Sequence, residues 1–196
     1  MKKTWKILKK QGLMDIVVRV LCRDGMDGLT MDAVAEEAGV AKGTLYAYFK
    51  NKQDLVKEAM EATVKPMVEE LLLILKSNLP PEERLRNMIA RHLSYFETHR
   101  DFFRIFVHDR FAAQRRLKRY RSGRYHEFLE TTAAVLDEGI RDGTFRCMDS
   151  LKAAAILVES DIAVINQRLL SDQPGPVETD AALISDVFFR GIQRNL

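Results

Sequence analysis

Residues 25–55 read GMDGLTMDAVAEEAGVAKGTLYAYFKNKQDL, and this stretch decides the fold of the N-terminal part of the chain. It predicts two short helices, over residues 31–38 and 42–49, joined by a short turn that contains a glycine. Thr30 can cap the first of these helices through its hydroxyl, and Gly39 allows the positive φ of a tight turn. The pattern therefore predicts a helix-turn-helix, with an ordinary helical corner as the alternative that these residues alone leave open.

Helical periodicity continues on both sides of this stretch, and no alternating run of β-branched residues indicates a sheet. A first helix is expected to run to about Asp24 and to stop at Gly25. Asn51 is expected to cap a longer helix that begins at Lys52, and Pro66 should kink or interrupt that helix. Later helices are predicted at about residues 80–96, 102–107, 115–141, 151–170 and 180–193. The chain is therefore predicted to be all-α.

The composition is that of a globular protein, with 46% hydrophobic and 30% charged residues among 196. Cys22 and Cys147 lie far apart without metal-ligand spacing, which favours reduced thiols in a cytosolic protein. Charged residues interrupt any export signal near the start, and every charge-free stretch is too short to cross a membrane. The net charge of +3 neither demands nor forbids a nucleic-acid partner.

One longer pattern runs through the predicted helix-turn-helix: Gly25-x4-Thr30-x3-Val34-Ala35-x2-Ala38-Gly39-Val40-x2-Gly43-Thr44-Leu45-Tyr46-x-Tyr48-Phe49-x2-Lys52-x2-Leu55. This pattern closely resembles the N-terminal DNA-binding domain of the TetR/AcrR family of bacterial transcriptional regulators. Two positions depart from it, because Ala41 stands where serine is common and Ile16-Val17 where an alanine pair is usual. The second helix of the motif is therefore expected to lack a side-chain cap, which costs about 1 kcal/mol.

The resemblance implies an all-α fold of about nine helices in two domains. Residues 1–58 are expected to form a three-helix helix-turn-helix DNA-binding domain, and residues 59–196 a helical effector-binding and dimerisation domain. Beyond the N-terminal pattern the resemblance is architectural only. It implies a homodimeric regulator that binds a double-stranded DNA operator in the cytoplasm, on the nucleoid.

The second helix of the motif has the residues that a major groove can accept. The groove is about 12 Å wide and admits one helix, whose N-terminal residues reach the base edges. The resemblance implies that the two tyrosines and the lysine that follow hold the DNA backbone, although packing inside the domain is an alternative for Tyr46. The lysine-rich start either follows phosphates or is a solvated terminus. The predicted DNA contacts are Thr30, Met31, Lys42, Gly43, Thr44, Tyr46, Tyr48 and Lys52.

Aromatic residues gather between Tyr95 and Phe128, which is compatible either with an ordinary core or with a ligand pocket. The resemblance implies a pocket for a small apolar or amphipathic effector in these helices. The candidate effector residues are His92, Phe96, Phe103, Phe106 and Phe128, with a hydrogen-bonded core role as the alternative for the histidine. The basic run from Arg110 to Arg124 is either a solvated face, a site for an anionic effector such as an acyl-CoA phosphate, or an auxiliary DNA contact.

The last two predicted helices carry apolar stripes at spacings of three and four residues. Two such helices from each of two chains build a four-helix interface across a twofold axis, as the family's dimers do. Burial within one chain is the alternative, and the first of the two helices has apolar residues enough for both. The predicted dimerisation residues are Leu151, Val158, Ile162, Ile165, Leu169, Ile184, Val187, Phe188 and Gly191.

The sequence has no pattern that indicates an enzyme, a metal site or a cofactor. The four histidines lack metal-ligand spacing, and no nucleophile or phosphate-loop motif occurs. We therefore predict a ligand-responsive repressor that binds a near-palindromic operator as a homodimer. The alternative is an architectural or division-linked DNA-binding protein on the same scaffold, with a protein partner in place of the small ligand.

Overall fold

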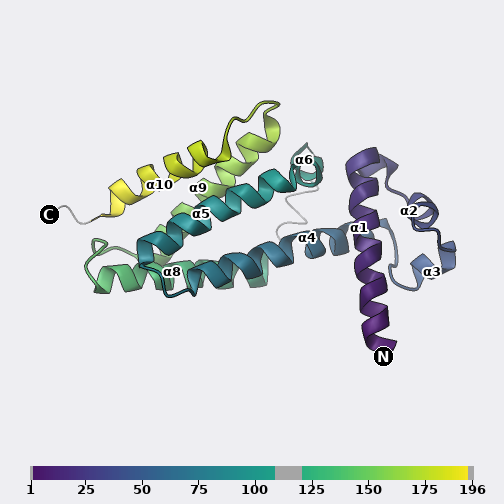
Figure 1. Cartoon of the computed structure of the whole chain (residues 1–196), viewed down its shortest axis with the longest axis horizontal. Coiled ribbons are helices and arrows are strands. Elements are labelled where there is room, and N and C mark those ends of the chain that lie inside the picture. The colour runs from purple at the N-terminus through teal and green to yellow at the C-terminus, as the bar shows by residue number, and fades with distance from the viewer. Residues whose placement is uncertain (1, 109–120, 194–196) are drawn as a thin grey trace. The chain divides into compact units, whose positions relative to one another are not determined.

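The computed structural model describes residues 2–108 and 121–193, and along these residues the chain is helical (Figure 1). They form nine α-helices and one π-helical turn, with a single isolated β-bridge in place of a sheet, so the all-α prediction is confirmed. None of these helices has both the length and the hydropathy that a membrane-spanning segment requires. The elements are α1 (Lys2–Gly28), α2 (Met31–Glu37), α3 (Lys42–Tyr46), α4 (Lys52–Leu75), α5 (Pro81–Thr98), α6 (Arg100–His108), η1 (Arg121–Tyr125), α8 (His126–Arg141), α9 (Ser150–Leu170) and α10 (Val177–Ile192).

The chain divides into two compact units, Met1–Pro66 and Met67–Leu196. This division and the predicted boundary after residue 58 both fall inside α4. The helix-turn-helix belongs to the first unit, and the aromatic residues and the last two helices belong to the second.

In the first unit, the local signals act where the sequence predicts them. The N-terminal helix turns at Gly25, whose φ is 69°. The hydroxyl of Thr30 accepts a hydrogen bond from the amide of Ala33 at 3.0 Å and caps α2. Gly39 follows α2 with a φ of 61°. The apolar face of α1 is buried and includes Leu13, Val17, Val20 and Leu21.

Helix α3 is shorter than predicted, because it ends at Tyr46 rather than near Phe49. After Tyr46 the backbone tightens into a turn in which the amides of Tyr48 and Phe49 both donate to the carbonyl of Leu45. The turn brings Phe49 into the core, where its ring is 1% exposed. Because burial of this ring stabilises the turn, α3 ends before the residue that the sequence pattern indicated.

Helix α4 begins as predicted, since the side chain of Asn51 accepts from the amide of Asp54 at 2.9 Å. The carboxylate of Asp54 accepts a hydrogen bond from the amide of Lys50 at 3.1 Å. In a capping box this carboxylate would accept from the amide of the N-cap residue, Asn51, instead. Pro66 does not interrupt α4, which continues to Leu75 as one helix of 24 residues, and the kink expected as the other outcome stays a prediction. A proline removes one donor, and the other hydrogen bonds of a long helix keep it continuous.

In the second unit, α5 packs against α8, α9 and α10, and α9 also packs against α6 and α8. Figure 1 shows α5, α9 and α10 running side by side above α8. Residues 115–120 of the predicted helix 115–141 lie outside the described residues, and from Arg121 to Tyr125 the chain is π-helical before α8 begins. Helix α10 starts at Val177, three residues earlier than predicted. Its first turn carries Glu178 and Asp180, and their negative charges stabilise the helix by interacting with the positive end of its dipole.

The loop after α8 is fixed against the end of α10. Phe145 is 2% exposed and stacks on Phe189 with ring centroids 6.1 Å apart. The amide of Arg146 donates to the carbonyl of Ile192 at 2.9 Å, beside a bridge between Phe145 and Gln193. Gly139 of α8 lies under the same ring, and a Cβ there would approach Phe145 Cδ2 to 2.3 Å. The loop therefore depends on the absence of a side chain at position 139.

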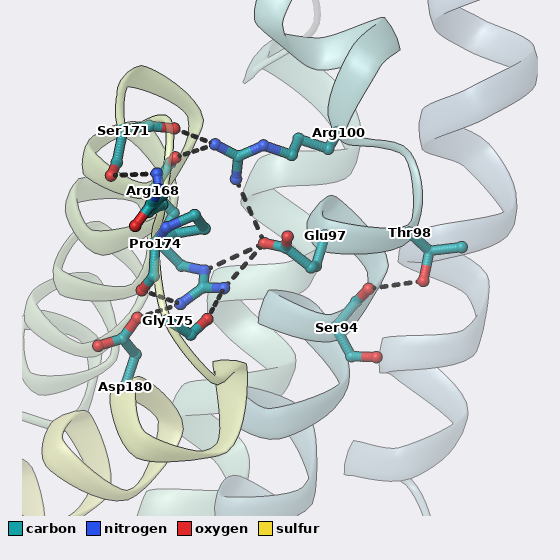
Figure 2. A network of polar contacts seen from close by, with 10 residues as sticks. Ser94, Glu97, Thr98, Arg100, Arg168, Ser171, Pro174, Gly175 and Asp180 are labelled. Atoms are coloured by element: carbon teal, nitrogen blue, oxygen red, sulfur yellow. Dashed lines mark hydrogen bonds and ion pairs between the residues drawn. The ribbon is translucent and has the colours of Figure 1, made fainter.

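Arg168 joins three segments near the end of α9 (Figure 2). Its guanidinium donates to the Glu97 carboxylate from Nε at 3.2 Å and from Nη2 at 2.9 Å, and it also binds the Asp180 carboxylate. It donates to the carbonyls of Pro174 at 3.3 Å and Gly175 at 3.0 Å. Burial opposes the charge, but the hydrogen bonds that the guanidinium donates to the two carboxylates outweigh it and raise the pKa of Arg168. These contacts fix the connection between α9 and α10 to the end of α5.

Candidate functional site

The N-terminus of α3 forms an exposed polar surface on the first unit. Leu45 is fully buried and anchors the helix, while Lys42, Gly43 and Thr44 are exposed. Tyr46 is 48% exposed, which favours the surface role predicted for it over packing inside the domain. The helix therefore has one buried contact and presents its remaining residues to solvent, as a helix that enters a major groove must.

Helix α3 begins without a side-chain cap, as the sequence predicts. Ala41 occupies the N-cap position in an extended conformation, and no side chain accepts a hydrogen bond from the first turn of the helix. The amide of Thr44 donates to the carbonyl of Ala41 at 2.8 Å. Amides at a helix N-terminus suit an anionic oxygen, and DNA phosphate is one candidate.

Lys42 forms an ion pair that sequence reasoning missed. Its ammonium lies 2.5 Å from the carboxylate of Asp32 in the first turn of α2, and this hydrogen bond raises the pKa of Lys42. Both side chains are exposed, so salt screens the pair and its contribution to stability is small. Asp32 also lies where the dipole of α2 favours an acid. The signal for the pair is the arrangement of one acid and one lysine at the N-termini of consecutive motif helices.

The other predicted DNA contacts differ in exposure. Thr30 is exposed but uses its hydroxyl to cap α2, and Tyr48 and Lys52 are half-buried. Met31 is buried in the core of the first unit, so we leave it out of the proposed DNA contacts. The side chains of the lysine-rich start, residues 2–10, lie outside the described residues, and their role stays a prediction.

The five predicted effector residues meet in the second unit. The rings of Phe96 and Phe103 have centroids 4.2 Å apart, and His92 lies 5.3 Å from Phe96 and 6.3 Å from Phe128. Phe102 contacts both Phe106 and Phe103 and so connects Phe106 to the other rings. Phe96 is half-buried and the other members are buried. We call His92, Phe96, Phe102, Phe103, Phe106 and Phe128 the ring cluster.

A buried acid lies beside the ring cluster. His92 Nδ1 is 2.6 Å from Oδ2 of Asp161 on α9, and the Asp161 side chain is fully buried. Its second oxygen, Oδ1, has no hydrogen-bond partner among the described residues. Burial raises the pKa of Asp161, against the opposing effect of His92. Sequence reasoning missed Asp161, although an acid three residues after Val158 and four before Ile165 lies on an apolar stripe and is a visible signal.

A surface hollow of about 470 Å³ lies elsewhere in the second unit. Arg84 lines it, pairing with Glu138 at 2.5 Å and donating to the carbonyl of Leu75 at 3.2 Å. None of the predicted effector residues lines this hollow. Across the described residues, no group of histidine, cysteine or acidic side chains is placed to hold a metal ion. Residues 110–120 of the basic run from Arg110 to Arg124 fall outside the described residues, and the role of the run stays a prediction.

The predicted dimerisation residues divide into two groups. Val158, Ile165, Leu169 and Ile184 are buried within the single chain, where they pack between helices of the second unit. Leu151, Val187 and Gly191 are exposed, and Ile162 and Phe188 are half-buried. Three large apolar side chains outside the predicted stripes are also exposed on α9 and α10: Ile156, Leu170 and Leu183. The apolar surface available to a partner is therefore rotated from the predicted stripe.

Two family models match the chain. Residues 14–59 match the model described as bacterial regulatory proteins, tetR family, and residues 78–161 match the tetracyclin repressor-like C-terminal domain. The first match contains the whole helix-turn-helix, and the second contains α5, α6 and α8 and more than half of α9.

Relatives match over most of the chain at low identity. An uncharacterized HTH-type transcriptional regulator YhgD of Bacillus subtilis is 24% identical over 95% of this chain and 98% of its own length. The HTH-type transcriptional repressor KstR2 of Mycobacterium tuberculosis is 26% identical over 68% of each chain. The structure of the transcriptional regulator FadR from Bacillus subtilis in complex with stearoyl-CoA has a TM-score of 0.73 and 20% identity, and covers 92% of this chain and 98% of its own.

Proposed function

We propose, from the premise that the chain belongs to the tetR family of bacterial regulatory proteins and is a DNA-binding transcriptional regulator, that it is a homodimeric repressor released from its operator by a small ligand. The observation that carries the proposal is the exposed N-terminus of α3, with Lys42, Gly43 and Thr44 on a helix anchored by Leu45. Binding to chromosomal DNA puts its action in the cytoplasm, on the nucleoid.

The proposed DNA contacts fall into base-reading and backbone-binding groups. Lys42 can donate to guanine O6 and N7, Gly43 lets the backbone approach the bases, and the Thr44 methyl can meet a thymine methyl. Tyr46, Tyr48 and Lys52 bind phosphates and carry no sequence information. Thr30 lies at the start of α2, where its backbone can approach the same groove.

The ion pair with Asp32 gives Lys42 two partners that exclude each other. In the free protein, the ammonium binds the carboxylate at 2.5 Å. On DNA, the same ammonium exchanges this carboxylate for a base edge, and Asp32 then faces the negative phosphates without its partner. The exchange costs little free energy, because both side chains are exposed and salt screens the pair.

The proposed dimer buries the exposed apolar residues of α9 and α10. Ile156, Leu183 and Val187 are 63%, 57% and 67% exposed in the single chain, and exposed side chains of this size usually mark an interface when they share one surface. Leu151 and Gly191 of the predicted set lie on the same two helices. A twofold dimer places its two α3 helices for half-sites about 34 to 36 Å apart.

The ligand response is proposed from the relatives. KstR2 is described as a repressor, and FadR was solved with stearoyl-CoA. A ligand bound at the ring cluster releases DNA by its preference for the DNA-incompetent state, so a 100-fold loss of affinity requires about 2.7 kcal/mol of differential binding. The proposed effector residues are His92, Phe96, Phe103, Phe106 and Phe128.

Footprinting and fluorescence anisotropy test this function. Purified protein is expected to protect one near-palindromic site in the DNA upstream of its own gene. Lys42→Ala should weaken binding to that site, whereas Lys76→Ala in the second unit, an exposed lysine far along the chain, should not. Protection of many scattered sites without a shared palindrome contradicts the proposal and favours an architectural protein.

A further inference from the structure

We propose that Asp161 and His92 form the polar anchor of the effector site, and that the effector is an apolar molecule which carries a hydrogen-bond donor, such as a hydroxyl group, aimed at Asp161 Oδ1. The inference rests on the proposed function, because it names the chemistry of the ligand that such a repressor binds. It assigns a role to the acid and chooses among ligand classes that the ring cluster alone accepts equally.

The unpartnered oxygen of Asp161 is the first observation. Oδ2 is bound to His92 Nδ1 at 2.6 Å, whereas Oδ1 has no partner in the described chain, and the side chain is fully buried. Buried polar atoms are almost always hydrogen-bonded, because an unsatisfied one loses its contact with water without compensation. An orphaned carboxylate oxygen therefore marks a position where a donor from outside the chain adds a bond.

The surroundings of the pair are the second observation. The His92 ring makes an edge contact with Phe96 at 5.3 Å and lies 6.3 Å from Phe128. Phe96 in turn lies on Phe103 at 4.2 Å. A mostly apolar wall with few polar groups is typical of sites for apolar ligands, and the polar groups fix the ligand's orientation.

The charge of the pair decides which polar group fits. The short contact between His92 Nδ1 and Asp161 Oδ2 is that of a charge-assisted hydrogen bond, so Oδ1 is a hydrogen-bond acceptor. Burial raises the pKa of Asp161, and a bound donor would oppose that effect by stabilising the charged form. A ligand carboxylate or phosphate at this position would meet a like charge in an apolar environment. The anchor therefore selects a hydrogen-bond donor and rejects an anion.

Access to Asp161 involves one ring in particular. Phe96 is half-buried, whereas His92, Phe103 and Phe128 are buried. A ligand that separates the Phe96 ring from Phe103 reaches the edge of His92 and then Asp161. Because Asp161 lies on α9, the helix that also carries the exposed Ile156, ligand binding at the anchor acts directly on a proposed dimer helix.

The test compares ligands that differ only in the donor. Isothermal titration of the whole protein without DNA uses two matched pairs, dodecan-1-ol with its methyl ether and 4-nonylphenol with 4-nonylanisole, and adds dodecanoate as the anionic probe. At least one donor compound is expected to bind about 10-fold or more tightly than its ether, the equivalent of one buried hydrogen bond. Dodecanoate is expected to bind more weakly than dodecan-1-ol.

Asp161→Asn replaces the carboxylate with a neutral group of the same shape, and it is expected to reduce the preference for the donor to about 2-fold or less. Asp101→Asn, which removes an exposed acid from α6, is the matched control and should keep the preference. Equal binding of alcohol and ether, binding of neither pair, or an unchanged preference in Asp161→Asn overturns the proposal. The comparison within the unsubstituted protein keeps the test decisive if Asp161→Asn does not fold.

Failure of the proposed function has a different signature. The proposed function fails if the protein does not bind its operator, or if no ligand changes that binding, and anisotropy with DNA measures both. The donor preference is measured without DNA. Donor preference without DNA release therefore contradicts the repressor model and leaves the anchor standing. Ligand-dependent release without donor preference contradicts the anchor alone.

Discussion

Replacement of Arg168 by methionine removes the charge that joins α5, α9 and α10 and keeps a side chain of similar length. The Arg168 side chain is 5% exposed, and its guanidinium makes five hydrogen bonds, to Glu97, Asp180 and the carbonyls of Pro174 and Gly175. Without it, two carboxylates lose their buried cation and two carbonyls lose their donor. Arg168→Met is therefore expected to destabilise the second unit.

The magnitude follows from the exposure of the partners. Removal of one member of a buried ion pair typically costs about 3–5 kcal/mol of unfolding free energy. The Glu97 and Asp180 side chains are 35% and 26% exposed, so water partly replaces the lost bonds. We therefore expect the lower end of this range, about 3 kcal/mol, which corresponds to about 6–12 °C in Tm for a chain of this size.

Circular dichroism against temperature and urea measures this loss. Arg190→Met is the matched control, because it breaks an exposed pair with Asp186 four residues away and should cost less than about 0.5 kcal/mol. In a double-mutant cycle, Glu97→Gln should cost much less in the Arg168→Met background than in the parent. A Tm of Arg168→Met within about 2 °C of the parent would refute the reasoning, since that shift is under 1 kcal/mol.

Three further substitutions test individual features. Gly139→Ala is expected to cost about 1–3 kcal/mol in unfolding free energy, because the new Cβ would lie 2.3 Å from the buried Phe145 ring. A Tm at or above that of the parent would show that the ring can move without cost. Ala41→Ser should raise Tm, since its hydroxyl can cap α3 for about 0.5–2 kcal/mol, and an unchanged Tm would show that the cap does not form. Lys52→Ala should weaken binding to all DNA sequences alike and reduce the salt dependence of binding by about one charge. Lys42→Ala should instead change the sequence preference in a selection from random DNA, and an unchanged preference removes Lys42 from base readout.

Features set by neighbours in the sequence were predictable. The cap at Thr30, the turns at Gly25 and Gly39 and the uncapped Ala41 depend on residues within about four positions, and the structure confirms each of them. Helix ends that depend on tertiary burial were less accurate. The end of α3 is the example, because burial of Phe49 stops it early.

Contacts between distant segments could not be predicted from one sequence. His92 and Asp161 are 69 positions apart, and Arg168 and Glu97 are 71 apart, so no periodicity connects them. The stripe on α9 shows the same limit. Apolar residues surround this helix, and only the packed structure separates Val158 and Ile165, which face the core, from Ile156, which is exposed. Periodicity identifies an apolar face but not the partner that covers it.

Operator spacing tests the central claim most directly. The protein is titrated by fluorescence anisotropy against its footprinted operator and against the same DNA with about 5 base pairs inserted at the centre, about half a helical turn. A dimer that presents two α3 helices on one face of the duplex should lose specific binding to the lengthened site. If the insertion is extended to about one full turn, binding recovers only if the dimer is flexible enough to span the longer distance. Equal affinity for the original and the half-turn site would contradict the account of a dimeric helix-turn-helix regulator.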